Sequence, residues 1–468
     1  MLTRTANGDS RLALWLRVRQ YAVPAPMIET ATARRHCGDW AAACAAAGFD
    51  VDFNLRSLAR SHGRDLADRI RADLRHLAPD LLRWHMPRIA PHGLLRPGLT
   101  LTLARYATAG PEDKAAPVHL VARTPPAWAD GGQRIGLALW DGSRSEAGVA
   151  GADPRRAARP DRRFRLDLHR HLWDARRTDE LRARSGADGP PCRDPSGPDP
   201  DLAGALPPEH GCAVDRWAAE AGIVLRAEGR DTGSITVRLG GRQRLVLDLV
   251  RDGPGTGAPS LRIRTAPTDG SAHTLPVLPD AAARLLPDLE LLRTGSIEAA
   301  RLHPLVAAAL APEAAAAPAP RTAGPETGPG QPRPVECRGA RHRIGLVDGV
   351  LTPLDHGPDE VRREELLAAL SGTPLPCLRA IDAAHRRPDC LTGVRERLDH
   401  GDVTGALAVV EGLLGPDALL RPGALLDELE AAARRRITYG LFRAGLAGPG
   451  PRRLPPNPVR ARHARRAS

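Results

Sequence analysis

Residues 234–250 read Ser-Ile-Thr-Val-Arg-Leu-Gly-Gly-Arg-Gln-Arg-Leu-Val-Leu-Asp-Leu-Val and decide the fold class. Both halves are rich in β-branched and apolar residues with polar residues between them, which is the pattern of paired strands. Gly240 and Gly241 separate the halves, and two glycines permit the positive φ angles of a tight hairpin turn. The stretch therefore predicts an antiparallel β-hairpin.

The chain on both sides of this hairpin also contains short segments with the pattern of strands. It predicts further strands at 99–106, 118–121, 135–140, 164–169, 223–226 and 261–264. Helices are predicted between the strands only at 174–184 and 212–221. So few intervening helices favour an α+β fold with a mainly antiparallel sheet region, spanning 99–311, over a doubly wound parallel sheet. Residues 186–208 are rich in Pro, Gly and Asp and predict a disordered insertion.

Helical patterns flank the sheet region. Residues 27–92 predict a helical segment in which Asp39 is an N-cap, and an apolar face repeats at helical spacing through Leu66, Ile70, Leu74, Leu77 and Leu81. Residues 279–311 return to a helical pattern. Residues 1–26 are interpreted either as an extension of the gene model ahead of Met27 or as a disordered end.

An Ala/Pro/Gly-rich linker at 313–334 separates this region from a C-terminal domain at 335–447. That domain begins with a predicted hairpin at 344–354, which turns at Asp348 and Gly349. Helices are predicted to follow from about residues 357, 401 and 425. The multi-domain organisation expected from the sequence is thus a helical part, a sheet region and a helix-rich C-terminal domain, followed by an Arg-rich disordered tail at 448–468.

Two helix starts share the pattern Gly-Asp-x-x-x-Ala, at 38–43 and 401–406. This pattern resembles the first helix of a tetratricopeptide unit over about a dozen residues each time. No 34-residue period links the two copies, so the sequence does not support a helical array. A shared preference for Asp as the helix cap explains the pattern equally well.

The charge of the chain is strongly positive. Sixty-seven Lys and Arg residues face 55 Asp and Glu residues, and the isoelectric point is about 10.4. Lys114 is the only lysine, a bias typical of proteins from high-GC genomes such as those of actinobacteria. The tail contains no acid and six arginines: Arg452, Arg453, Arg460, Arg462, Arg465 and Arg466. Such a tail either contacts nucleic-acid phosphates or is a solvated end.

Seven widely spaced cysteines form no disulfide framework, which favours reduced thiols and a cytoplasmic protein. The most apolar region, 302–320, contains His303, Pro304, Pro312 and Glu313. It falls short of the ~20 apolar residues that a membrane span needs, so no membrane association is expected.

Two groups of residues contain side chains that can bind a metal ion. Asp167, His169 and His171 would share one face of the predicted strand at 164–169, so His169 and His171 could bind a metal together with Asp174. The alternative is the solvated face of a half-buried strand. The second group is Cys337, His342, Cys377 and Cys390, where zinc is the metal to expect. It lacks a Cys-x-x-Cys pair, and separate buried residues are the alternative interpretation.

Motifs of common enzymes are absent from the sequence. There is no Gly-x-x-x-x-Gly-Lys-Ser/Thr phosphate loop, no Gly-x-Ser-x-Gly elbow and no His-Glu-x-x-His zinc motif. No catalytic or cofactor-binding residue is therefore predicted, and the sequence resembles no specific family. The function expected is an accessory, protein-interaction module.

The residues predicted to contact a protein partner are the scarce aromatic ones, Trp40, Trp84, Tyr439 and Phe442, because aromatic side chains dominate many interfaces. Two alternatives stay open. One is a metal-dependent hydrolase that uses His169 and His171. The other is a nucleic-acid-binding protein that uses the arginines of the tail.

Overall fold

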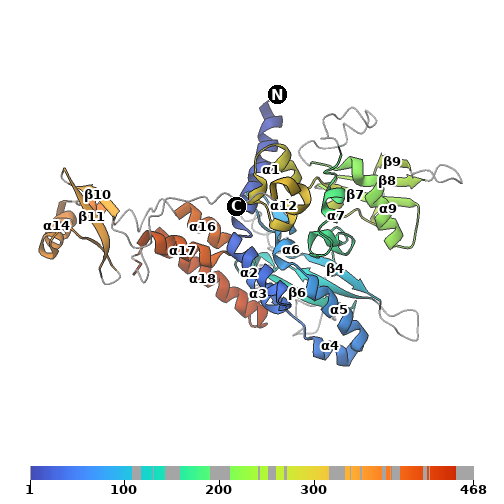
Figure 1. Ribbon diagram of the computed structural model, residues 1–468, viewed down its shortest axis with the longest axis horizontal. Helices are drawn as coiled ribbons and strands as arrows, with labels where there is room; N and C mark the ends of the chain where they lie inside the picture. Colours follow the sequence, from blue (N-terminus) through green and yellow to red (C-terminus); the bar gives the residue numbers. More distant parts are fainter. Residues whose placement is uncertain are drawn as a thin grey trace, which may run out of the picture.

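The computed structural model places the elements in three groups along the chain (Figure 1). The structure describes residues 2–448 except 108–116, 130, 143–158, 190–210, 241–242, 251–259, 268–270, 316–332, 338, 348–349, 372–375, 380, 382–390, 415–418 and 421. Most of the insertion predicted at 186–208 and most of the linker predicted at 313–334 therefore lie outside the described residues. The same holds for the turn at 348–349, for Cys390 and for the arginines of the tail.

The first group begins with helices, as predicted. They are α1 (Leu2–Tyr21), α2 (Ala25–His36), α3 (Trp40–Ala46), α4 (Leu55–His62), α5 (Arg64–His76) and α6 (Pro79–His85). The predicted apolar face is confirmed, because Leu66, Ile70 and Leu74 of α5 are all buried. Helix α1 covers much of 1–26, the segment interpreted as an extension or a disordered end. It places Val18 and Arg19 in the interior.

A four-stranded sheet packs with these helices in one apolar core. Its strands have the order β1 (Phe49–Val51), β6 (Ile135–Trp140), β5 (Val118–Arg123), β4 (Thr100–Tyr106). Strand β1 runs parallel to β6 and the other pairs are antiparallel. Leu101 and Leu103 on β4 and Leu120 on β5 are fully buried against the helices, so the sheet supplies one wall of the core. A short hairpin of β2 (Arg88–Ile89) and β3 (Leu94–Leu95) follows α6.

The second group is built on the hairpin predicted at 234–250, which is confirmed. Strands β7 (Gly233–Gly240), β8 (Gln243–Val250) and β9 (Ser260–Thr265) form an antiparallel sheet. Ile235 pairs with Leu247 and Val237 with Leu245. These side chains pack against helices α9 (Trp217–Ala227) and α10 (Asp280–Ala283). Trp217, the first residue of α9, is fully buried in this core.

The third group is the C-terminal part. The strands β10 (Arg333–Cys337), β11 (Ala340–Val347) and β12 (Val350–Pro353) form a second antiparallel sheet. The helices α14 (Pro358–Ser371), α16 (Leu391–Asp399), α17 (Val403–Leu414) and α18 (Ala424–Arg443) follow. The α+β fold class predicted from the sequence is therefore confirmed, with several small sheets that are mainly antiparallel.

Helices α16 and α18 contact the first group (Figure 1). The Tyr439 hydroxyl on α18 donates a hydrogen bond to Asp50 at 2.7 Å, and Arg443 forms an ion pair with Asp52 at 2.6 Å. The Arg83 guanidinium of α6 donates to the carbonyl of His400 at 2.9 Å. Residues more than 300 positions apart in the chain are thus joined through polar contacts.

Shorter elements connect these groups. They are the 3-10 turns η1 (Ala127–Ala129), η2 (Leu166–Leu168), η3 (Arg170–Leu172), η5 (Val214–Arg216), η6 (Ser271–His273) and η7 (Ala299–Arg301), and the helices α7 (Glu180–Ser185), α11 (Pro287–Arg293), α12 (Pro304–Leu310) and α13 (Pro312–Ala315). None of the described helices is long and apolar enough to cross a membrane.

Two predicted strands are wrong. Within 164–169, Leu166–Leu168 form the turn η2, and the His169 amide donates to the Leu166 carbonyl at 3.1 Å. Among the described residues, only an isolated bridge between Arg165 and Thr102 of β4 remains in place of a strand ladder. Residues 223–226 belong to helix α9. A run of three apolar residues such as Ile-Val-Leu is too short to show whether the apolar residues repeat with the period of a strand or of a helix. In the structure Trp217, Ala221 and Val224 are buried on one face of helix α9. The predicted helix at 174–184 forms only at its end, as α7.

Candidate functional site

A cavity of about 200 Å³ lies where α1, the end of α6, α7, the start of α9 and the loop between α10 and α11 meet. Its lining is strongly basic. It contains two histidines, His85 and His171, and one carboxylate, Asp280, and its arginines are Arg11, Arg19, Arg88, Arg96, Arg163, Arg184, Arg216 and Arg284. An excess of arginine around a partly open cavity is the feature that sets this site apart.

Four of these arginines are neutralised by carboxylates. The pairs are Arg11–Glu290 at 2.9 Å, Arg19–Asp288 at 2.7 Å, Arg163–Asp280 at 2.6 Å and Arg184–Glu220 at 2.7 Å. Each pair joins segments that are distant in the sequence. The four pairs therefore fix the walls of the cavity without leaving a net charge of their own.

The other four arginines, Arg88, Arg96, Arg216 and Arg284, have no ion pair with a carboxylate among the described residues. Arg88 donates to the carbonyl oxygen of Arg83 at 2.7 Å, and Arg216 donates to that of Arg284 at 3.2 Å. The Nε atoms of Arg88 and Arg216 are buried without a hydrogen-bond partner in the described part of the chain. These four arginines therefore lack a direct ion pair in the described residues, although Glu220 and Asp215 are near enough to Arg216 to favour its charged form.

The two histidines are buried and neutral. Burial lowers the pKa of His85 to about 4, and burial together with the neighbouring His169 holds the pKa of His171 well below its usual value. His85 Nδ1 lies 3.3 Å from the Leu172 carbonyl. His85 Nε2 and His171 Nδ1 are buried without a hydrogen bond in the described structure. His171 Nδ1 is thus left for a ligand, whereas His85 Nε2 lies 3.9 Å from the Asp288 carboxylate.

Local sequence explains how Arg88 reaches this place. Pro87 disfavours helical conformation at the residue before it, so α6 ends at His85 and Met86 is extended. The chain then enters strand β2, whose residue Arg88 pairs with Leu95 of β3. His85 and Arg88 therefore face one space although one ends a helix and the other begins a strand.

The structure separates the residues of the predicted metal site at His169, His171 and Asp174. His169 Nε2 lies 3.2 Å from Glu220, and His171 lines the cavity. The centres of the two imidazole rings are 5.7 Å apart and the rings are inclined at 61°. In the described residues their ligand atoms do not converge with those of Asp174. The hydrolase function that depends on this pair stays a prediction.

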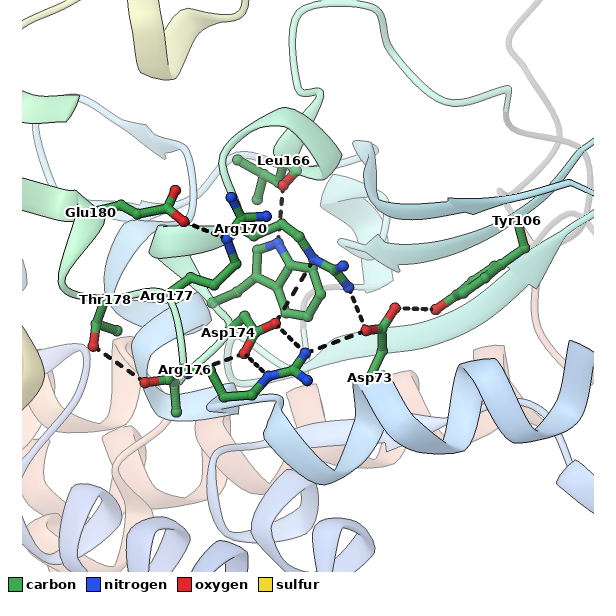
Figure 2. Close-up of polar contacts among 11 residues, drawn as sticks. Asp73, Tyr106, Leu166, Arg170, Asp174, Arg176, Arg177, Thr178 and Glu180 are labelled. Atoms are coloured by element: carbon green, nitrogen blue, oxygen red, sulfur yellow. Dashed lines mark hydrogen bonds and ion pairs between the residues drawn. The ribbon is translucent and has the colours of Figure 1, made fainter. Parts of the chain in front are cut away.

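Asp174 belongs to a different network (Figure 2). Its carboxylate accepts two hydrogen bonds from the Arg176 guanidinium, at 3.1 and 2.8 Å. Although burial acts to raise it, these bonds hold the pKa of Asp174 below its usual value. Arg170 links Asp174 to Asp73, which accepts a 2.7 Å bond from the Tyr106 hydroxyl. The Asp174 carboxylate thus contacts Arg170 and Arg176 and does not face the two histidines of the predicted metal site.

The second group of predicted ligands is partly brought together. Cys337, Cys377 and His356 present ligand atoms that all lie within 4.8 Å of one another, and no other group of this kind occurs in the described residues. Sequence reasoning named Cys337 and Cys377 but missed His356, which follows a predicted strand at no recognisable metal-binding spacing. His342 stacks on His356 with ring centres 4.3 Å apart.

The aromatic residues predicted to contact a partner have partners within the chain. Trp84 is only 1% exposed, and Trp40 packs against the first core. Tyr439 is buried, and Phe442 meets Trp128 edge to face with ring centres 5.3 Å apart. Trp84 thus offers no surface to another protein in this structure, and the protein-interaction function stays a prediction.

The basic cavity was not predicted, apart from His171. Its lining comes from segments between residues 11 and 287, so no local motif carries it. The lining arginines also cannot be recognised by their residue type, because arginines are frequent everywhere in the sequence. No family model, no curated protein and no solved structure matches this chain, so its function is argued from its own residues.

Proposed function

We propose that this protein binds a small multivalent oxyanion of the phosphate class in the basic cavity. The observation that carries the proposal is the set of four arginines without a carboxylate ion pair around a partly open space of about 200 Å³. Arg88, Arg216 and Arg284 are half-buried and Arg96 is exposed. Charges that are partly removed from water are costly unless they are paired. An anion bound among Arg88, Arg96, Arg216 and Arg284 supplies the missing counter-charge.

The size of the cavity restricts the ligand. Pockets for drug-sized molecules are usually about 300–1,000 Å³, so a volume of about 200 Å³ suits a smaller molecule. The planar guanidinium group donates two parallel hydrogen bonds to phosphate or carboxylate oxygens. Several such groups converging from different elements favour a compact ion with many acceptor oxygens. Inorganic pyrophosphate has this chemistry and is a suitable probe.

The electrostatics of the cavity support the same ligand class. Burial, together with the nearby Arg83 and Arg19, lowers the pKa of Arg88 well below its usual value. Burial likewise lowers the pKa of Arg216. Holding a charged guanidinium at these positions therefore costs free energy when no anion is bound. A bound oxyanion reverses this effect, because an opposite charge at hydrogen-bonding distance stabilises the charged form.

Thermal unfolding in the presence of different anions tests the proposal. Pyrophosphate is expected to raise the Tm more than sodium chloride at the same ionic strength, because a ligand that binds only the folded state stabilises it. The double substitution Arg96→Ala/Arg216→Ala removes two unpaired charges and is expected to abolish this difference. The proposal is wrong if pyrophosphate and chloride act alike on the wild type.

A matched control separates the cavity from general charge. Arg56 and Arg60 are exposed on α4, far from the lining residues. The variant Arg56→Ala/Arg60→Ala loses the same net charge and is expected to keep the full response to pyrophosphate. An equal loss in both variants would mean that the anion binds the basic surface without using the cavity.

The buried histidines predict a pH dependence of binding. Without an anion, His85 has a pKa of about 4 and is neutral at neutral pH. A bound anion raises this pKa, so binding takes up a proton and becomes tighter as the pH falls. If the anion restores His85 to the ordinary histidine pKa of about 6.5, sulfate affinity increases by about tenfold between about pH 7.5 and about pH 5.5, and this is the expected result.

Sulfate is the right probe for this measurement because its own charge does not change over this range. Isothermal titration calorimetry in two buffers with different ionisation enthalpies gives the number of protons taken up. An affinity that stays constant with pH, with no proton uptake, would show that neither His85 nor His171 senses the anion.

A further inference from the structure

We propose that the C-terminal part holds a zinc ion on Cys337, His356 and Cys377, with His342 as the fourth ligand. This inference concerns a different part of the chain from the basic cavity and does not depend on it. The three ligand atoms lie within 4.8 Å of one another. A tetrahedral zinc centre, with bonds of about 2.0–2.3 Å, places neighbouring ligand atoms about 3.3–3.8 Å apart.

The orientation of His356 fits a metal ligand. Its Nε2 atom lies 3.7 Å from Cys377 Sγ, and its Nδ1 atom lies 3.3 Å from the Glu360 carboxylate. A histidine that binds zinc usually donates its other ring N–H to a carboxylate or a carbonyl, which fixes its tautomer. His356 therefore has one ring nitrogen facing a possible co-ligand, Cys377, and the other facing a carboxylate, Glu360, that can fix its tautomer.

The cluster joins three separate segments of the C-terminal part. Cys337 ends strand β10, His356 follows strand β12, and Cys377 lies beyond α14. Both cysteines are fully buried, next to apolar side chains such as Ile344 and Ile381. This apolar core is small. A structural zinc ion contributes directly to the folding free energy of such a unit.

His342 is the candidate for the fourth ligand. Its ring nitrogens are not among the ligand atoms that lie within 4.8 Å of one another, so its ring has to turn to reach the metal. Its ring stacks on His356 at 4.3 Å, and its Nδ1 atom is buried without a hydrogen bond in the described part of the chain. Strand pairing places it opposite Val335, two residues before Cys337. Two thiolates and two imidazoles are a usual ligand set of structural zinc and a poor set for calcium or magnesium.

Elemental analysis tests the assignment. The full chain is expressed in zinc-supplemented medium and purified under reducing conditions without chelators or a His tag. About one zinc per chain is expected in the wild type, and less than a tenth of that in Cys337→Ser, His356→Ala and Cys377→Ser. The exposed Cys37 lies outside the cluster, so Cys37→Ser is expected to retain the full amount.

A spectroscopic measurement on the wild type avoids the problem of variants that fail to fold. Cobalt(II) replacing the zinc is expected to give the sulfur-to-metal charge-transfer band of thiolate coordination and the visible bands of a tetrahedral site. His342→Ala is expected to weaken zinc binding by at least about tenfold. Unchanged binding would overturn the role of His342.

Two results would overturn the whole proposal. The first is a reduced wild-type protein that holds neither zinc nor cobalt. The second is a Cys337–Cys377 disulfide in the freshly purified protein, found by peptide mass spectrometry, with no metal present. Zinc that survives both cysteine substitutions would contradict the proposal equally, because it would have to be held elsewhere.

Discussion

Replacing Asp288 by alanine is expected to lower the free energy of unfolding by about 3–5 kcal/mol, because it leaves a buried arginine without its counter-charge. Both carboxylate oxygens of Asp288 accept hydrogen bonds from Arg19, each at 2.7 Å. The side chains are 1% and 0% exposed. The Trp84 indole also donates to Asp288 at 3.2 Å. Urea unfolding of wild type and variant measures the difference.

An exposed ion pair supplies the contrast. Asp68 pairs with Arg71 on the surface of α5, and Asp68→Ala is expected to cost less than about 1 kcal/mol. The double substitution Arg19→Met/Asp288→Leu removes both charges and is expected to recover much of the stability lost in Asp288→Ala. A cost below about 1 kcal/mol for Asp288→Ala would show that α1 is not anchored through this pair.

The second large effect is expected at Arg83, which joins three segments of the chain. Its guanidinium donates to the carbonyls of Ala22 at 2.9 Å, Gln133 at 2.6 Å and His400 at 2.9 Å, and the residue is 1% exposed. Hydrogen bonds from charged groups contribute about 1.5–3 kcal/mol each, and buried acceptors left unpaired are costly. Arg83→Ala is therefore expected to destabilise the protein by at least about 3 kcal/mol.

Because one of these bonds holds the C-terminal helices, the loss has a local signature. Hydrogen exchange of peptides that cover residues 391–414 is expected to accelerate in Arg83→Ala more than exchange in α5. Arg435 pairs with Asp399 nearer the surface, so Arg435→Ala is the matched control and is expected to have a small effect. Exchange of 391–414 at the wild-type rate would contradict the role assigned to Arg83.

Features that depend on neighbouring residues could be predicted from the sequence. The Asp39 side chain accepts a hydrogen bond from the Ala42 amide, and Asp402 accepts one from Gly405, so both Gly-Asp openings are capped helix starts. The apolar face of α5 and the hairpin of β7 and β8 likewise follow from spacing within a dozen residues. Such elements can be predicted from local spacing alone because each one buries a single face, which places apolar residues at regular intervals in the sequence.

Features that depend on distant residues could not be predicted. Residues 164–169 alternate like a strand, but Trp173 folds back and its indole donates to the Leu166 carbonyl at 3.0 Å, which stabilises a turn. His356 joins Cys337 and Cys377 only once the hairpin and α14 have brought them together. In the same way, Arg88 and Arg216 come to one cavity from segments more than 100 residues apart.

The central claim is that the cavity binds a small oxyanion, and a calorimetric titration of the full chain with pyrophosphate tests it most directly. We predict one binding site per chain in the wild type and in Arg56→Ala/Arg60→Ala, and at least about tenfold weaker binding in Arg96→Ala/Arg216→Ala. Binding should weaken as salt is added, because salt screens charges. No binding to the wild type, or equal affinity in the cavity variant, would contradict the claim.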